Sequence, residues 1–271
     1  MQKQFKIPNI REAFEVDLGN TYCYWFLPEH PGEGNRTLLD VFNMCFNEFK
    51  WDTFIEPGTT VIDIGAHSGD TAIPMQLIAQ STVLAVEPNP IIKPYLDFAC
   101  LMNKHLGKFV TAHEAVTTQD TTVEILDHFN SMCNGGLIDP SWSPELQERM
   151  RGMSGNRITV PGLTLEHLCE KYLTEEEIAR IGFIKTDTEG HDVSILKSGA
   201  ALIERYKPVL FIEWFFAFTD VESREMFDVI EALGYQAYYP LTLKPATIDQ
   251  RSDDLLLIHK SKIKNYEILQ A

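Results

Sequence analysis

The stretch Thr60-Thr-Val-Ile-Asp-Ile-Gly-Ala-His-Ser-Gly-Asp-Thr71 decides the fold of this 271-residue chain. Its apolar residues predict a buried β-strand over 61–64, and its glycines predict a turn that leads into a helix. A second apolar strand, over 83–86, ends in the acidic residue Glu87. A strand, a glycine turn, a helix and an acidic strand end are together typical of an open α/β sheet that binds a nucleoside cofactor at the carboxyl ends of its strands.

Predicted strands and helices alternate along most of the chain, which is the pattern of a parallel sheet covered by helices. Beyond the opening stretch, we expect strands over 108–116, 121–126, 183–186, Val209–Glu213, 237–239 and Asp254–His259. We expect helices over 37–50, 70–80, 90–106 and 221–233 and one from Val193, and the alternation resumes after the 127–156 segment at Leu165–Tyr172. The predicted fold class is therefore α/β, with a doubly wound, mostly parallel, Rossmann-like sheet.

The same pattern divides the chain into regions. Residues 1–57 precede the alternating part and form an N-terminal extension, which we expect to pack on the core. Residues 58–271 form the main domain. Within it, residues 127–156 interrupt the alternation with a polar segment, and a loop of this length inside a compact domain is usually functional or mobile. We expect this insertion to act as a lid over the substrate.

Composition and charge limit the partners. The chain has 23 Lys and Arg against 39 Asp and Glu, which gives a net charge of −16. Such a surface repels phosphate backbones, so we expect no nucleic-acid partner. The five cysteines form no Cys-x-x-Cys pair, no apolar run is long enough for a membrane span, and the first ten residues do not resemble a signal peptide. These features predict a cytoplasmic protein with reduced thiols and leave its oligomeric state open.

The glycine turn favours S-adenosylmethionine over a dinucleotide. A dinucleotide site requires Gly-x-Gly-x-x-Gly, whereas only Gly65 and Gly69 are present here. Asp63 stands at the strand end, two residues before Gly65, where its carboxylate can meet a positively charged group. S-adenosylmethionine offers such a group in its methionine ammonium, whereas a pyrophosphate would be repelled. Glu87, at the end of the next strand, is placed to accept both ribose hydroxyls.

Further residues complete the predicted cofactor site. His67 either lies near the cofactor carboxylate or only hydrogen-bonds locally. Asn89 is expected at the ribose or the adenine edge, and Glu114 with Ala115 at the adenine amino group. The full predicted set of cofactor-binding residues is Asp63, Gly65, Ala66, His67, Gly69, Asp70, Thr71, Glu87, Asn89, Glu114 and Ala115.

The second dense motif is Phe183-Ile-Lys-Thr-Asp-Thr-Glu-Gly-His-Asp192. Its strand should end near Asp187, at the carboxyl edge that also carries the cofactor site, and the next strand presents Glu213 there. Carboxylates crowded in this way raise the pKa of one of their number, which makes it a general base, or they bind a divalent cation such as Mg²⁺. The structural alternative is that Asp187 and Glu189 only cap the helix that follows. The predicted catalytic residues are Asp187, Glu189, Glu213 and His191.

These residues together resemble the FkbM-type methyltransferases, a family of S-adenosylmethionine-dependent O-methyltransferases. The resemblance covers roughly residues 55–240 and rests on Val61-Ile-Asp-Ile-Gly-Ala-His-Ser-Gly-Asp-Thr71, Glu87-Pro-Asn89 and Ile184-Lys-Thr-Asp-Thr-Glu-Gly190. Two positions depart from the family pattern. His67 stands where members commonly have Asn, and Thr188 stands where they often have Val.

The resemblance implies a class I methyltransferase fold and methyl transfer to a hydroxyl, often on a sugar or another small molecule. By the residue match, Asp63, Gly65 and Glu87 would hold the cofactor, and the Asp187 motif would face a small-molecule or glycan acceptor. We expect Asp187, or a bound divalent metal, to assist removal of the hydroxyl proton. The alternatives are a non-catalytic interaction or carbohydrate-binding module on the same fold, and an NAD-dependent oxidoreductase, which the incomplete glycine pattern disfavours.

Overall fold

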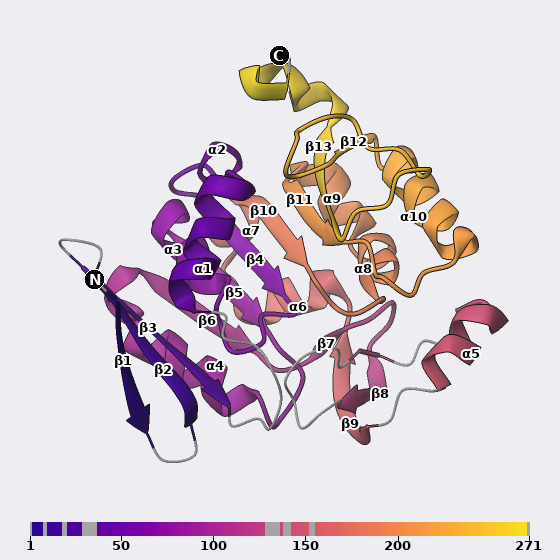
Figure 1. Ribbon diagram of the computed structural model, residues 1–271. Coiled ribbons are helices and arrows are strands. Elements are labelled where there is room, and N and C mark those ends of the chain that lie inside the picture. The colour runs from indigo at the N-terminus through magenta and orange to yellow at the C-terminus, as the bar shows by residue number, and fades with distance from the viewer. Residues whose placement is uncertain are drawn as a thin grey trace.

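The structure is a computed structural model that describes residues 2–7, 10–17, 21–28, 37–127, 136–137, 142–151 and 155–269. In this part of the chain the central sheet has seven strands (Figure 1). Their spatial order is β12 (Tyr235–Tyr238), β13 (Asp254–His259), β11 (Val209–Glu213), β10 (Ile181–Thr186), β4 (Thr60–Ile64), β5 (Thr82–Val86) and β6 (Lys108–Ala112). Neighbouring strands are parallel except at β13, which runs antiparallel to both β11 and β12. The doubly wound, mostly parallel sheet is confirmed, and this strand order is that of the class I methyltransferase fold.

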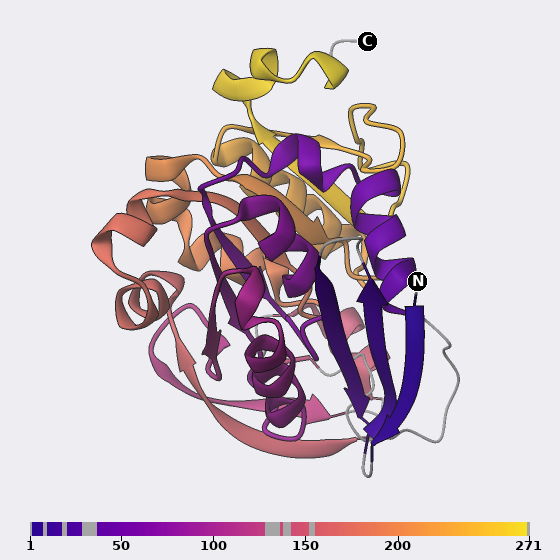
Figure 2. The same cartoon turned by 90° about the vertical axis from the view of Figure 1, so that its left-hand side faces the viewer.

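Helices cover both faces of the sheet, as the two views show (Figures 1 and 2). One face carries α1 (Leu38–Asn43), α2 (Trp51–Phe54), α3 (Ala72–Ala79) and α4 (Lys93–Met102). The other carries α6 (Leu165–Tyr172), α7 (Glu175–Ala179), α8 (Asp192–Ser198), α9 (Ala200–Tyr206) and α10 (Asp220–Ala232). Alternate residues of each strand therefore enter different cores: Val61 packs with α3 and α4, whereas Ile62 packs with α6 and α8.

Two smaller sheets flank the central one. An antiparallel sheet of β1 (Gln2–Ile7), β2 (Ile10–Asp17) and β3 (Tyr22–Pro28) lies beside α4. The second has the order β7 (Ala115–Val116), β9 (Asn156–Leu163) and β8 (Thr121–Asp127). The remaining elements are α5 (Pro144–Arg151), a π-helix η1 (Met44–Glu48) and the 3₁₀ helices η2 (Lys104–Leu106), η3 (Lys260–Asn265) and η4 (Glu267–Leu269). Within the described residues, none of the helices has the length and apolar character needed to cross a membrane.

The structure corrects several predicted elements. The single strand expected over 108–116 is two strands, because the chain leaves the central sheet after β6 and β7 pairs with β9 instead. The strand expected over 121–126 exists as β8 but also belongs to the second small sheet. We did not predict β9, because Pro161 and Gly162 interrupt its apolar pattern. The helix expected over 37–50 changes to a π-helix after Asn43.

The predicted lid is only partly described. Residues 136–137 and α5 belong to the 127–156 insertion, while 128–135, 138–141 and 152–154 lie outside the described residues. The described parts pack on the domain: the backbone N–H of Ser143 donates to Glu222 at 3.0 Å, and Arg149 donates to the carbonyl of Ala217 at 3.0 Å. The domain boundary after residue 57 and the lid function stay predictions.

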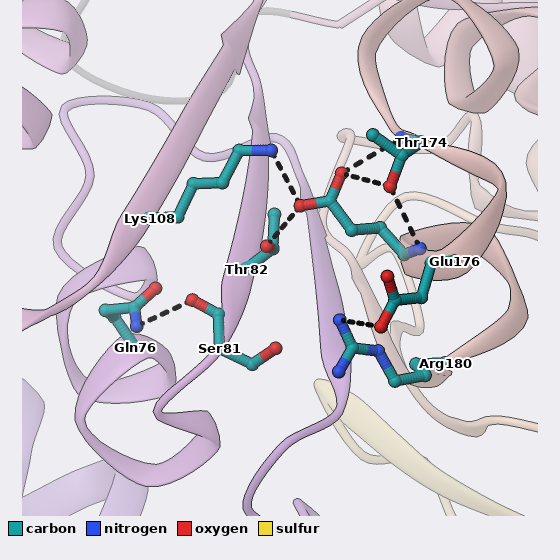
Figure 3. Close-up of polar contacts among 8 residues, drawn as sticks. Gln76, Ser81, Thr82, Lys108, Thr174, Glu176 and Arg180 are labelled. Atoms are coloured by element: carbon teal, nitrogen blue, oxygen red, sulfur yellow. Dashed lines mark hydrogen bonds and ion pairs between the residues drawn. The ribbon is translucent and has the colours of Figure 1, made fainter.

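A buried carboxylate joins α7 to the amino-terminal edge of the central sheet. One oxygen of Glu177 accepts from Thr82 Oγ at 2.6 Å and from Lys108 Nζ at 2.7 Å, and the other accepts from the backbone N–H of Thr174 at 2.9 Å (Figure 3). Burial acts to raise the pKa of Glu177, but these hydrogen bonds outweigh it and lower the pKa to about 2. The ionised form is thus strongly favoured in the folded protein.

We expect Glu177→Gln to lower the free energy of unfolding by about 1–3 kcal/mol at pH 7, because the ionised acceptor of these hydrogen bonds is lost. A folded-state pKa below the unfolded value gives stability that is complete above about pH 4.5 and is lost as the pH falls toward 2. Urea unfolding at pH 7 and pH 3 should therefore show a smaller difference from wild type at pH 3. The control is Glu176→Gln on the same helix, whose exposed carboxylate pairs with Arg180 at 3.5 Å (Figure 3); an equal loss in both variants would contradict the prediction.

Candidate active site

The turn after β4 has the backbone conformation of a ligand-binding glycine loop. Gly65 (φ +77°), His67 (φ +45°) and Gly69 (φ +89°) all have left-handed φ values. A Cβ on Gly65 would lie 1.8 Å from the carbonyl oxygen of Asp187, so only glycine fits at this position. This contact brings the backbone of the glycine turn directly against the second predicted motif.

Asp63 and Lys185 form a buried ion pair that follows from strand register. They are direct partners across β4 and β10, and Lys185 Nζ lies 3.3 Å from Asp63 Oδ1. Asp63 is fully buried, and its other oxygen accepts from Thr71 Oγ at 2.7 Å. Burial raises the pKa of Asp63, and the charge of Lys185 opposes that rise. Lys185 thus already balances the negative charge of Asp63. The predicted contact of Asp63 with a cofactor ammonium stays a prediction.

Lys185 also reaches the second motif, since its Nζ lies 3.4 Å from Asp187 Oδ2. Burial alone would lower the pKa of Lys185, but the charges of Asp63 and Asp187 outweigh it and raise the pKa. One buried cation therefore links the predicted cofactor motif to the predicted catalytic motif.

Glu87 lies at the end of β5 with both oxygens held by backbone N–H groups. It accepts from His67 N at 3.0 Å and from Asn89 N at 2.8 Å, and its side chain is largely buried. Burial raises the pKa of Glu87, while the neighbouring His67 and the two N–H groups oppose the rise. Asn89 in turn donates to Asp127 at 2.8 Å. Asp127, which the sequence analysis did not single out, thus supports this end of the site from the start of the insertion.

Glu114 and Ala115 lie where the chain crosses from β6 to β7. The Glu114 carboxylate accepts from Lys171 Nζ at 2.5 Å and from the hydroxyl of Tyr172 at 2.9 and 3.0 Å. Burial acts to raise the pKa of Glu114, but these hydrogen bonds lower it. The carboxylate is therefore engaged by α6, and its predicted contact with an adenine amino group stays a prediction.

The second motif forms a tight acidic turn after β10. Glu189 has a left-handed φ of +56°, and its backbone N–H donates to Glu213 Oε2 at 2.8 Å. Carboxylate oxygens of Asp187, Glu189 and Glu213 all lie within 4.8 Å of one another. His191 is buried and holds the N-cap position of α8. The structure thus brings together the three predicted carboxylates and places His191 on the same turn.

Two further acids border this cluster. Asp254 of β13 is the direct partner of Glu213 across the antiparallel pair, and burial followed by the charge of Asp187 raises its pKa to about 7. Asp192, in the first turn of α8, is fully buried and accepts from Thr188 Oγ at 2.9 Å. Burial raises the pKa of Glu213 far above its ordinary value, and the neighbouring carboxylates, led by Asp192, raise it further. Both effects favour the protonated form of Glu213.

The insertion contacts this acidic turn from outside. A Cβ on Gly136 would lie 2.8 Å from the carbonyl oxygen of Glu189, and a Cβ on Gly190 would lie 3.2 Å from the ring of Trp142. Trp142 is buried against this turn.

Comparisons with known proteins identify the family. The model of the methyltransferase FkbM domain matches residues 63–237, which is more than half of the chain. Among solved structures, an FkbM methyltransferase from Methylobacillus flagellatus KT is 15% identical with a TM-score of 0.46, and the match covers 74% of this chain but only 43% of that one. A search of curated protein sequences finds no match.

Other solved structures are similarly distant. The Methanococcus jannaschii fibrillarin pre-rRNA processing protein is 14% identical with a TM-score of 0.41, covering 95% of this chain and 96% of its own. A T. thermophilus 16S rRNA methyltransferase, in complex with AdoMet and guanosine, is 14% identical with a TM-score of 0.43, covering 92% and 50%. Such low similarity assigns no function, so the assignment rests on the family model. By that match, the chain belongs to the FkbM family of methyltransferases.

Proposed function

We propose that this protein transfers the methyl group of S-adenosylmethionine to a hydroxyl of a small-molecule or glycan acceptor. The observation that carries the proposal is the position of Lys185, whose Nζ lies 3.3 Å from Asp63 in the cofactor motif and 3.4 Å from Asp187 in the acidic motif. The donor side and the acceptor side of the reaction thus meet at one buried cation.

The residues after β4 and β5 fit this cofactor. The left-handed turn at Gly65 brings the backbone close to the sheet edge. Two backbone N–H groups fix the Glu87 carboxylate at the same edge, where ribose hydroxyls can donate hydrogen bonds to it. When bound, S-adenosylmethionine supplies a methyl group on a positively charged sulfur. The net charge of −16 and the acidic edge suit a cation of this kind.

Asp187 is the group we assign as general base. Its side chain is 46% exposed, whereas Glu189 and Glu213 are less exposed, so Asp187 is the carboxylate that an acceptor reaches most easily. Lys185 Nζ lies 3.4 Å from this carboxylate, whose oxygen atoms can accept the proton of a hydroxyl. Alignment of the acceptor oxygen supplies most of the rate in a displacement of this type, and proton removal adds to it.

Glu213 and Glu189 are assigned to hold the acceptor. A protonated Glu213 can donate a hydrogen bond to an acceptor oxygen, and Glu189 can accept one from a neighbouring hydroxyl. A site with donors and acceptors of this kind suits a molecule with several hydroxyls, as a sugar has. The strongly negative net charge disfavours a nucleic-acid acceptor.

A divalent cation is the second means of activating the hydroxyl. The oxygen atoms of Asp187, Glu189 and Glu213 fit the ligand preference of Mg²⁺, and they lie within 4.8 Å of one another. Bound there, Mg²⁺ would lower the pKa of an acceptor hydroxyl.

Isothermal titration calorimetry with S-adenosylhomocysteine, with and without MgCl₂, tests the proposal. We expect a dissociation constant in the micromolar range. At a ligand concentration one hundred times this constant, the free energy of unfolding should rise by about 2.7 kcal/mol. Binding without Mg²⁺, followed by methyl transfer in its absence, supports the carboxylate base; a requirement for Mg²⁺ supports the metal. No binding in either condition would contradict the proposed function and favour a non-catalytic module.

A further inference from the structure

The N-terminal sheet lies outside the residues that match the family model, yet one of its strands contacts the cofactor turn. Alternate residues of β3 face different neighbours. Tyr24 and Phe26 pack with α4, and the ring centroids of Phe26 and Phe98 lie 4.6 Å apart. Cys23 and Trp25 enter a separate small core with α1 and α3. β3 is therefore buried on both sides, as a strand that belongs to the domain rather than to a loose extension.

Hydrogen bonds fix the position of β3 along α4. The side chain of Asn103, at the end of α4, accepts from Tyr24 N at 2.8 Å and donates to Tyr24 O at 2.5 Å. His105 lies 2.7 Å from the carbonyl oxygen of Tyr22. Asn103 is fully buried. These two hydrogen bonds clamp the backbone of Tyr24 and thereby fix the position at which the side chain of the next residue, Trp25, packs into the core.

Trp25 contacts the glycine turn through a buried hydroxyl. Its indole Nε1–H donates to Ser68 Oγ at 2.9 Å; Ser68 is fully buried and Trp25 is 2% exposed. Ser68 Oγ in turn lies 3.1 Å from His67 Nδ1. A hydroxyl that accepts from an indole keeps its own hydrogen free to donate, and His67 Nδ1 is the neighbouring acceptor. Ser68 Oγ therefore joins the indole of Trp25 to the imidazole of His67.

His67 needs such support. It is a non-glycine residue with φ +45°, a conformation that persists only where its surroundings hold it. Its backbone N–H donates to Glu87 at 3.0 Å, so the same residue joins the turn to the predicted ribose-binding carboxylate. A shift of His67 would therefore move both the glycine turn and the Glu87 carboxylate.

We propose that Trp25 is a positioning residue of the cofactor site: through Ser68 it holds His67 and the glycine turn in the conformation that binds S-adenosylmethionine. The inference rests on the proposed function. It assigns to the N-terminal sheet a part in cofactor binding.

Calorimetry with S-adenosylhomocysteine on Trp25→Phe tests this inference. Phenylalanine keeps the ring in the core and removes the N–H donor, so we expect the dissociation constant to rise about five-fold, as the loss of one hydrogen bond predicts. The matched control is Trp51→Phe, because Trp51 is equally buried and its indole nitrogen has no hydrogen-bond partner among the described residues. The control should change the dissociation constant less than two-fold.

A double-mutant cycle separates positioning from packing. In a His67→Asn background, which removes the imidazole, Trp25→Phe should have no further effect on the dissociation constant. Ser68→Ala should weaken binding as much as Trp25→Phe, and it replaces that variant if the latter does not fold. An unchanged dissociation constant in both variants, or a full five-fold loss that persists with Asn at position 67, would overturn the inference. No binding by the wild-type protein would instead refute the proposed function itself.

Discussion

Asp187→Asn is expected to lower turnover by about 10²–10⁴-fold, the usual contribution of a positioned general base. Asparagine has the same shape but cannot take a proton. Because Asp187 is half-exposed at the end of β10 and its removal leaves Lys185 paired with Asp63, folding should be little affected. The dissociation constant of S-adenosylhomocysteine should stay within about two-fold of wild type, because a general base acts in the transition state and does not contribute to cofactor binding.

The control for this variant is Glu87→Ala, which should raise the dissociation constant of S-adenosylhomocysteine strongly, because Glu87 is the carboxylate assigned to the ribose. Both variants are measured by calorimetry and by single-turnover methyl transfer, which separates chemistry from binding. An equal loss of cofactor binding in the two variants would contradict the division of the site into a donor side and an acceptor side.

The cofactor edge of the fold could be predicted from sequence because its signals are local. A five-residue buried strand, a glycine turn and an acid at the next strand end are each encoded within a few residues, and the structure has β4, Gly65 and Glu87 where the pattern predicts them. The acidic turn at Asp187 was local in the same sense. Pairing of parallel strands then places both motifs at one edge without any further information.

What could not be predicted depends on contacts between distant parts of the chain. Asp254 joins the acidic cluster only because β13 inserts antiparallel between β11 and β12, and its register with Glu213 leaves no trace in the local sequence. The position of Trp25 beside Ser68 likewise follows from the clamp of Asn103 on β3. The crossing from β6 to β7 was missed because an apolar pattern predicts a strand but not its partner.

The buried pair of Lys185 and Asp63 gives the second large effect: Lys185→Met is expected to lower the free energy of unfolding by about 3–5 kcal/mol, because removing one partner leaves an uncompensated buried charge. Asp63 is fully buried and Lys185 is 4% exposed, so water cannot replace the lost contact. Urea unfolding at pH 7 measures the loss. The control is Lys197→Met, since Lys197 pairs with Glu225 on the surface and should contribute less than about 1 kcal/mol.

The cause of that loss can be tested by removing the second charge. Asp63→Asn in the Lys185→Met background should recover much of the stability, because a neutral pair carries no unpaired buried charge. The single variant should also become more stable relative to wild type as the pH falls. Burial raises the pKa of Asp63 and the charge of Lys185 opposes that rise, so without Lys185 the folded state binds the proton more tightly than in wild type and gains stability at lower pH. A deficit independent of pH, and not relieved by Asp63→Asn, would mean that Lys185 contributes through packing of its alkyl chain rather than through its charge.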